Sequence, residues 1–466
     1  EMQRSLVGSE MCIRDSSILE LYVRRKTMAA ERKTLTQLSV PICLETLFYM
    51  LSGMVDTLML SSVSDQAVGA VGTANTYIGV FIIMFGVISS GMVAVMSQNI
   101  GAGRPGIAYQ ARQLGLVFNA LTGILMSVVL AVFSGGILRA VSIAPALLES
   151  AETYLKIVGG ASFLNALIPI FSSYLRVFGY TKHSLIGTVV GNVINIILNS
   201  VFLFVFHWGV MGVATATVIS KVVNLIIVAA MGAVLIKAKQ SPERAQSRRI
   251  LAQIVKIGFP SAFETALYNV AMTFIVCFMN HMDTDGMNVT ARSYAMQIAN
   301  FSYCVGAALA QANAIMTGWR IGAKKYEECD RGTRKAVIYG LVTATCFSVT
   351  FAITGRFIVH IFTNDIQMIE LVVKLLVVDI FLEFGRVTNL VYGQALKTSG
   401  DAIFPVIMGA IFMYLFAVGG TYFLGIHMGL LAVGAYIAMA GDECARAVGM
   451  VLRWKSGKWK SKSLVE

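Results

Sequence analysis

Long apolar segments recur along the whole chain, and they constrain its fold more than any other feature. We count about twelve of them, each long enough to cross the ~30 Å hydrocarbon core of a bilayer as a helix. Hydrophobic residues make up 56% of the chain and charged residues only 13%. Transmembrane β-strands would instead give alternating segments of about ten residues, which we do not find. The sequence therefore predicts an all-α membrane protein with twelve transmembrane helices.

The charged stretches between these segments predict two six-helix lobes. Residues 237–249, KAKQSPERAQSRR, form the one long, charged, proline-containing stretch inside the chain and mark the seam. We expect a cytoplasmic leader at 1–34 (with 1–27 interpreted as non-native), lobes at 35–237 and 251–453, a linker at 238–250 and a tail at 454–466. The expected helices cover 35–60, 70–99, 112–136, 150–177, 184–206, 209–236, 251–281, 289–319, 331–358, 367–397, 401–425 and 429–453.

The distribution of lysine and arginine predicts the orientation. With both termini in the cytoplasm, 28 of these residues lie in or beside inside segments, and Lys221 and Arg386 lie within spans. Five are expected outside: Arg139, Lys156, Arg292, Arg356 and Lys374. This asymmetry follows the positive-inside rule, so the net charge of +12 reflects membrane topology and not nucleic-acid binding. We expect a monomeric, multi-pass protein of the inner or plasma membrane, surrounded by lipid.

Motifs for catalysis or metal binding are missing from the sequence. The seven cysteines are scattered without metal-ligand spacing, and we find no zinc motif, nucleophile elbow or phosphate-binding loop. We therefore expect no enzymatic activity, no catalytic residues, no metal and no cofactor.

A sequence motif of the first apolar segment occurs twice. Pro41-x-x-x-Glu45-Thr46-x-x-Tyr49 recurs 219 residues later as Pro260-x-x-x-Glu264-Thr265-x-x-Tyr268. Three further landmarks recur at an offset of 220 or 221 residues: Ile100-Gly101-Ala102 with Ile321-Gly322-Ala323, Gly179 with Gly400, and His207 with His427. Because each lobe has an even number of helices, the repeats predict pseudo-symmetric bundles related by an axis along the membrane normal.

Ionisable residues inside the first lobe are the first functional candidates, because an acid inside a membrane is costly and normally faces a cavity or a partner. Asp56 is the strongest candidate for cation coupling, although an acid near the outer interface could simply be solvated. Asn195 and Asn199 could offer amide groups to it or pack between helices, and Lys221 is its expected ionic partner. Glu45, eleven residues before Asp56 on nearly the same helix face, is either a cavity acid or a packing contact.

The second lobe has its own candidates for binding substrate or a proton. Asp379, Glu383 and Arg386 follow the i, i+4, i+7 spacing of one helix face, and Asn389 lies on the next turn. Two acids beside one arginine leave one net negative charge, which suits a cation; the alternative is a neutralised structural cluster. Glu264 and Tyr268 complete this predicted site.

The sequence resembles the MATE (multidrug and toxic compound extrusion) transporters over Leu35–Arg453. The likeness rests on Pro41…Gly53-Met54-Val55-Asp56-Thr57, on Gln98-Asn99-Ile100-Gly101-Ala102, and on the asparagine stripe leading into Trp208-Gly209-Val210-x-Gly212. It implies a V-shaped pair of bundles, alternating access, and export of small cationic or amphipathic compounds in exchange for H⁺ or Na⁺.

The resemblance also bears on individual residues. Asp56 matches the first-helix aspartate that one branch of the family uses for coupling, whereas Asn199 stands where that branch has a second aspartate. At the positions where the other branch has its coupling acids, this chain has Tyr268 and Arg386. Glu264 lies one turn earlier than that branch would place its acid. The resemblance therefore leaves H⁺ and Na⁺ both open.

These features predict a secondary antiporter for organic cations or drugs. The first alternative is a flippase for a lipid-linked or amphipathic metabolite, for which we would expect a strongly cationic cavity. A membrane-embedded enzyme or a channel is a further alternative, but an enzyme needs a clustered catalytic motif and a channel more often uses several subunits.

Overall fold

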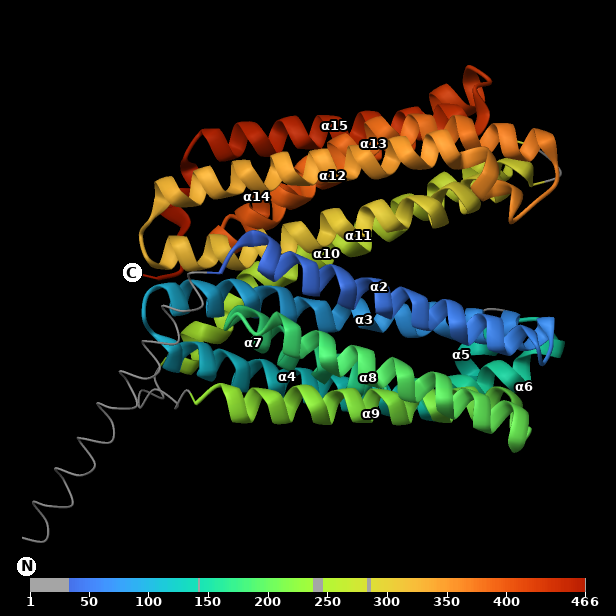
Figure 1. The fold of residues 1–466 in the computed structure, drawn as a ribbon, viewed down its shortest axis with the longest axis horizontal. Helices are drawn as coiled ribbons and strands as arrows, with labels where there is room; N and C mark the ends of the chain where they lie inside the picture. Colours follow the sequence, from blue (N-terminus) through green and yellow to red (C-terminus); the bar gives the residue numbers. More distant parts are fainter. Residues whose placement is uncertain (1–32, 141–142, 238–245, 283–285, 466) are drawn as a thin grey trace, which may run out of the picture.

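The computed structural model describes residues 33–140, 143–237, 246–282 and 286–465. These residues form helices joined by short turns, with no strand among them. Figure 1 shows two groups of long, nearly parallel helices, which we call the N-lobe (α2–α9) and the C-lobe (α10–α15). The all-α prediction is confirmed. Residues 1–32 and most of the predicted linker lie outside the described residues.

The N-lobe contains six membrane-crossing segments. Its fourth segment is broken at residues 160–162, where the two halves bend by 42°. The elements are α2 (Leu35–Ser61), α3 (Asp65–Gly101), α4 (Pro105–Val132), α5 (Ser134–Ala140), α6 (Pro145–Tyr154), the π-helix η1 (Leu155–Gly159), α7 (Phe163–Val177), α8 (Thr181–Ser200), the π-helix η2 (Val201–Val205) and α9 (Gly209–Leu235).

The C-lobe repeats this arrangement with six segments. Its first helix begins at Gln246, so residues 246–250 of the predicted linker are helical. The elements are α10 (Gln246–Asn280), α11 (Met287–Gly322), α12 (Tyr326–His360), α13 (Ile366–Ser399), α14 (Ile403–Phe412), the π-helices η3 (Met413–Val418) and η4 (Thr421–His427), α15 (Leu431–Lys455) and the 3₁₀ turn η5 (Lys458–Lys462).

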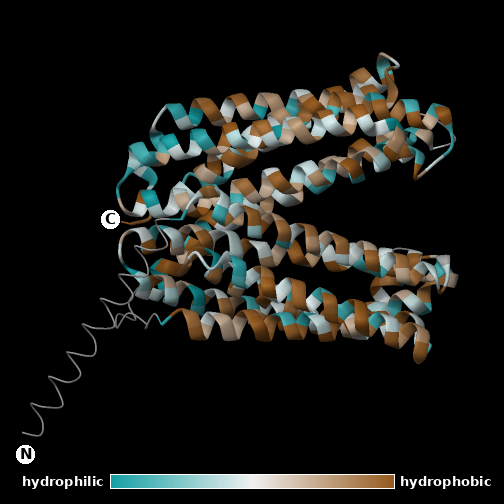
Figure 2. Ribbon diagram, in the orientation of Figure 1, coloured by the Kyte–Doolittle hydropathy of each residue, from teal (hydrophilic) through white to brown (hydrophobic). Residues whose placement is uncertain are grey.

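Length and hydropathy explain why these segments are helical. Eight helices, or nine if the bent pair counts as one span, are long and apolar enough to cross a membrane. Within lipid a helix satisfies its own backbone hydrogen bonds, which an open strand does not. The remaining three, α11, α13 and α15, are also long but carry more polar side chains. Figure 2 shows hydrophobic residues along the helices of both lobes, interspersed with polar ones. The nine candidate spans and these three helices together make the twelve predicted spans among the described residues.

Helix ends follow local sequence signals. Thr34 caps α2 in a capping box with Gln37, and Asp365 caps α13. Gly400 ends α13 with φ 100°, a left-handed conformation that glycine adopts without a steric penalty. These signals fix where the spans begin and end, and therefore which side chains reach the lobe interior.

The two lobes meet through a pseudo-symmetric pair of hydrogen bonds. The Gln98 side chain at the end of α3 donates to the backbone carbonyl of Thr398 at 2.6 Å, and the Trp319 indole at the end of α11 donates to the backbone carbonyl of Val177 at 3.0 Å. Both donors and both acceptors are 221 residues apart, the offset of the sequence repeat. We call this pair the inter-lobe lock. The sequence repeat therefore relates the contacts between the lobes as well as the two similar bundles.

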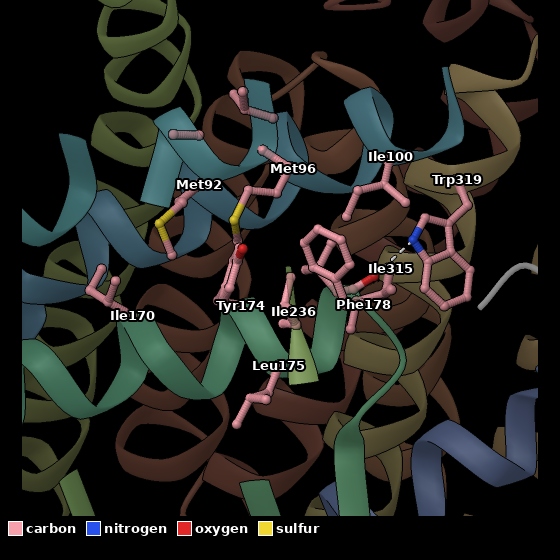
Figure 3. Packing of buried hydrophobic residues seen from close by; sticks show 14 of the residues in the cluster. Met92, Met96, Ile100, Ile170, Tyr174, Leu175, Phe178, Ile236, Ile315 and Trp319 are labelled. Atoms are coloured by element: carbon pink, nitrogen blue, oxygen red, sulfur yellow. Dashed lines mark hydrogen bonds between the residues drawn. The ribbon is translucent and has the colours of Figure 1, made fainter. Parts of the chain in front are cut away.

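A buried apolar cluster surrounds the lock. Figure 3 shows Met92, Met96 and Ile100 of α3 beside Tyr174, Phe178, Ile315 and Trp319, with the Trp319 hydrogen bond drawn as a dashed line. Residues from both lobes belong to this cluster, and each lobe has a further cluster of its own.

The segment after α15 also lies in this junction. The Leu464 backbone N–H donates to Gln98 at 2.8 Å, and its carbonyl accepts from the Gln253 side chain at 3.0 Å. Its side chain packs on Ala94, Ile257 and Ala402. Residues 463–465 therefore bridge α3 of the N-lobe and α10 of the C-lobe.

Candidate functional site

A cavity of about 420 Å³ lies inside the C-lobe. Helices α10, α11, α13 and α15 supply most of its wall, and α14 and η3 supply the remainder. Five of the predicted site residues line it: Glu264, Tyr268, Asp379, Arg386 and Asn389. The sixth, Glu383, is fully buried behind the wall and contacts Arg386. The structure therefore brings together the residues that the sequence assigned to this lobe.

Glu264 forms an ion pair across the cavity wall. Its carboxylate lies 2.6 Å from the Lys397 amine of α13, and both side chains line the cavity. Pro260, one turn earlier in α10, is accommodated within the helix. Lys397 was counted as an inside cation from its place near the end of a span, yet its side chain points into the lobe.

Helices α13 and α15 together build a chain of alternating charges. Arg386 contacts Glu383 at 2.5 Å and Glu443 at 3.7 Å. Arg446 then contacts Glu443 at 3.0 Å and the buried Asp442 at 2.6 Å. The predicted Glu383–Arg386 pair is thus present, but it is one end of a larger network.

Sequence reasoning missed the α15 half of this network. Asp442, Glu443 and Arg446 follow i, i+1, i+4 spacing within an otherwise apolar segment, the same kind of signal that marked α13. The Asn389 side chain donates to Glu443 at 2.9 Å and ties the two helices together. The prediction of two acids beside one arginine was therefore incomplete.

Arg292 corrects another prediction. We expected it outside the membrane, but it lies on α11 with only 8% of its surface exposed and lines the cavity. The positive-inside count treats a residue near the start of a span as a loop residue. A long arginine side chain can instead turn into the protein, because its aliphatic stem packs among apolar groups.

The N-lobe contains a separate polar cluster around Asp56. Asn199 of α8 donates to the Asp56 carboxylate at 2.6 Å and contacts Asn195 at 3.3 Å. Lys221 of α9 interacts electrostatically with Asp56, as does Tyr154 of α6. The four residues predicted for cation coupling therefore lie together, and Tyr154 is an addition that the sequence did not reveal.

The donor set of this cluster suits a small monovalent cation or a proton. Asp56 supplies a carboxylate, and the buried Asn199 amide oxygen has no hydrogen-bond partner in the part of the chain that the structure describes. Oxygen atoms of this kind are the ligands that hard cations prefer. Among the described residues, no group of three or more His, Cys, Asp or Glu side chains is arranged to hold a metal ion.

Glu45 is buried in the N-lobe and makes polar contacts with two neighbouring helices. Its carboxylate is 2.7 Å from Arg176 of α7 and accepts a hydrogen bond from Ser184 of α8 at 3.0 Å. It does not line the C-lobe cavity. The pair is the N-lobe counterpart of Glu264–Lys397, because Arg176 and Lys397 are 221 residues apart.

Comparison with known proteins gives consistent similarities over nearly the whole chain. The family model MatE matches residues 41–201 and 260–423. An uncharacterized transporter, YisQ, of Bacillus subtilis is 32% identical, with 94% of this chain and 97% of that protein covered. A probable multidrug resistance protein, NorM, of Thermotoga maritima is 25% identical, with 96% and 97% covered.

A solved structure shares the same fold. The crystal structure of a MATE protein in the bent conformation aligns with a TM-score of 0.85 and 18% identity, covering 94% of this chain and 98% of that one. At this identity the likeness concerns the arrangement of helices, including the two bundles.

Proposed function

This chain belongs to the MATE family of membrane transporters, and from that premise we propose that it exports organic cations or drugs in exchange for H⁺ or Na⁺. Membership makes it a multi-pass membrane transporter and not an enzyme. The name of the NorM relative, a probable multidrug resistance protein, supports a drug-like substrate. The coupling ion and the exchange mechanism are the parts that need a physical argument.

The observation that carries the proposal is the charged cavity within an apolar lobe. Buried ionisable groups in a membrane are unfavourable unless a partner, a ligand or water compensates them. The C-lobe cavity and its immediate wall hold five acids and four cations, which leaves one net negative charge. A cavity of a few hundred Å³ with this charge suits a drug-sized molecule that carries a positive group.

We assign the coupling ion to the Asp56 cluster of the N-lobe. Asp56 is half-buried and accepts a hydrogen bond from Asn199, and Lys221 interacts with it electrostatically at longer range, so a proton or a cation can neutralise its charge. Two sites in separate lobes allow ion and substrate to bind independently. Rocking of the lobes about their junction would then expose both sites alternately to each side of the membrane.

The inter-lobe lock supports this mechanism, because it is a small set of contacts that can form in one conformation and break in another. It joins the lobes at the ends of α3, α7, α11 and α13, which lie on the same side as the start of α2. We place that side in the cytoplasm of a cell-membrane protein that acts as a monomer, with lobes at 35–237 and 251–453. Breaking the lock would open the inside face.

Proteoliposomes test this function directly. Efflux of a fluorescent organic cation is measured under a pH gradient and, separately, under a Na⁺ gradient. We expect one gradient to drive efflux, Asp56→Asn to abolish the dependence on it, and Glu264→Gln and Glu383→Gln to weaken substrate transport. Glu370→Gln, an exposed acid of α13, serves as the matched control.

Two results would contradict the proposal. Transport that ignores both gradients would exclude ion exchange. Transport that is unchanged in all three variants would exclude these residues as the sites.

A further inference from the structure

Two charges in the C-lobe cavity lack the ionic partner that every other charge there has. Glu264 is paired with Lys397, and Arg386 and Arg446 are shared among Glu383, Glu443 and Asp442. In the described part of the chain, Arg292 and Asp379 form no ion pair within 4.0 Å. They have opposite signs, and both line the cavity.

Arg292 is a buried cation without an acid. Among the described residues, its Nη2 atom makes its one hydrogen-bond contact with the Met272 sulfur, at 3.7 Å, and its buried Nε atom has no hydrogen-bond partner. A guanidinium has five donors and normally satisfies them with carboxylates or carbonyls. With 8% of its surface exposed, the side chain faces the cavity and is prepared for an anionic group that the protein itself does not supply.

Asp379 is the matching acid. It is 4% exposed, and no described residue donates a hydrogen bond to its carboxylate. Arg386 interacts with it only at longer range, because that guanidinium is held by Glu383 and Glu443. A buried carboxylate without a donor is strongly disfavoured, so the site is incomplete without a cation.

Tyr436 of α15 links the two charges. It is itself a cavity residue, its hydroxyl approaches the Arg292 backbone carbonyl at 3.5 Å, and it interacts electrostatically with both Arg292 and Asp379. The two unpaired charges and Tyr436 therefore line one cavity, and a single ligand in that cavity can meet both charges.

We propose that the C-lobe cavity binds amphoteric ligands, with Asp379 receiving an ammonium group and Arg292 receiving a carboxylate a few bonds away. A simple cation would satisfy Asp379 and leave Arg292 uncompensated, and a simple anion would do the reverse. An amphoteric ligand satisfies both and leaves the net charge of the cavity unchanged. This inference rests on the proposed transport function and specifies its substrate class.

A matched pair of fluorescent probes tests the inference. Nα-dansyl-L-lysine carries a carboxylate and an ε-ammonium group, and its methyl ester keeps only the ammonium. Binding of each probe to the purified full-length protein is followed by dansyl fluorescence. We expect the wild-type protein to bind the free acid more tightly than the ester by roughly 10- to 100-fold, because hydrogen bonds between charged groups are strong.

The variants separate the two charges. Arg292→Gln should remove the preference by weakening the free acid alone, and Arg292→Lys should keep part of it. Asp379→Asn should weaken both probes. Arg356→Gln, an exposed arginine of α12, should change neither. The thermal unfolding temperature of each variant, compared with that of the wild-type protein, distinguishes a loss of binding from a loss of fold.

Several outcomes overturn the inference. These are equal affinity of the wild-type protein for both probes, binding of neither, or equal weakening of both by Arg292→Gln. Gradient-driven transport of the ester is measured separately. Transport of the ester without a preference for the free acid refutes this inference alone, whereas an Arg292-dependent preference without transport refutes the proposed function alone.

Discussion

Substitution of Gly91 by alanine should shift the protein away from the conformation in which the lobes are closed. Gly91 of α3 faces the backbone of Ile254 in α10, so the two helices approach each other as closely as a missing side chain permits. A methyl group there would overlap the Ile254 carbonyl oxygen and would lie 2.8 Å from the Ile254 carbonyl carbon, whereas ordinary contact begins at 3.4 Å. The helices would have to separate by more than the 0.6 Å that the carbon alone requires, because the carbonyl oxygen lies nearer still.

The size of the effect follows from the rigidity of the contact. The obstacle is backbone and not a flexible side chain, so rotamer changes do not relieve it. Overpacking of this kind costs about 1–3 kcal/mol, which raises the ratio of open to closed protein by roughly 5- to 150-fold. Gly86→Ala provides the control, because nothing lies within 4 Å of its added methyl group and both substitutions raise helix propensity alike.

The rate at which Cys304 is labelled measures how often the two lobes separate. This buried thiol of α11 contacts the Met50 sulfur of α2 across the lobe junction, so a water-soluble maleimide reaches it only when the lobes part. With the other cysteines replaced by serine, we expect labelling in detergent to be faster in Gly91→Ala by the factor above and unchanged in Gly86→Ala. Equal rates in both variants would refute the steric argument.

Three further predictions concern contacts at the same junction and in the cavity wall. Trp319→Phe removes the donor to Val177 and leaves a smaller ring in the buried cluster, so Cys304 labelling should be at least about 2- to 10-fold faster, the part expected for a hydrogen bond worth ~1 kcal/mol. Lys397→Met leaves the Glu264 carboxylate unpaired and should lower the thermal unfolding temperature in detergent, and adding Glu264→Gln should restore most of it; no restoration would mean that the pair is not the cause. Leu464→Asp places a charge in an apolar contact and should also accelerate Cys304 labelling, whereas an unchanged rate would show that residues 463–465 do not hold the lobes together.

The sequence revealed the architecture well because its signals are periodic and repeated. Apolar length predicts spans, and the 219–221-residue offset predicts two similar bundles. The same offset turned out to relate the donors and acceptors of the inter-lobe lock. Candidate site residues on α2, α8 and α13 were also found, because a polar residue inside an apolar run is conspicuous.

The sequence did not reveal how polar residues near helix ends are oriented. Arg292, Lys397 and Arg446 were all counted as loop or inside cations, yet each lines the C-lobe cavity. Spacing along a helix fixes which residues share a face but not how that face is rotated toward the lobe interior. For the same reason the partners of Glu45 and Glu264, which come from distant helices, could not be assigned.

The inter-lobe lock has an evolutionary consequence. Both of its acceptors are main-chain carbonyls, at Val177 and Thr398, so mutations at these two positions leave the acceptor atoms in place. Substitutions at the donor positions, Gln98 and Trp319, can by contrast remove a hydrogen bond of the inter-lobe lock. Gene duplication thus left two chemically different donors, an amide and an indole, facing equivalent main-chain acceptors. One donor can therefore change during evolution while the other still joins the two lobes.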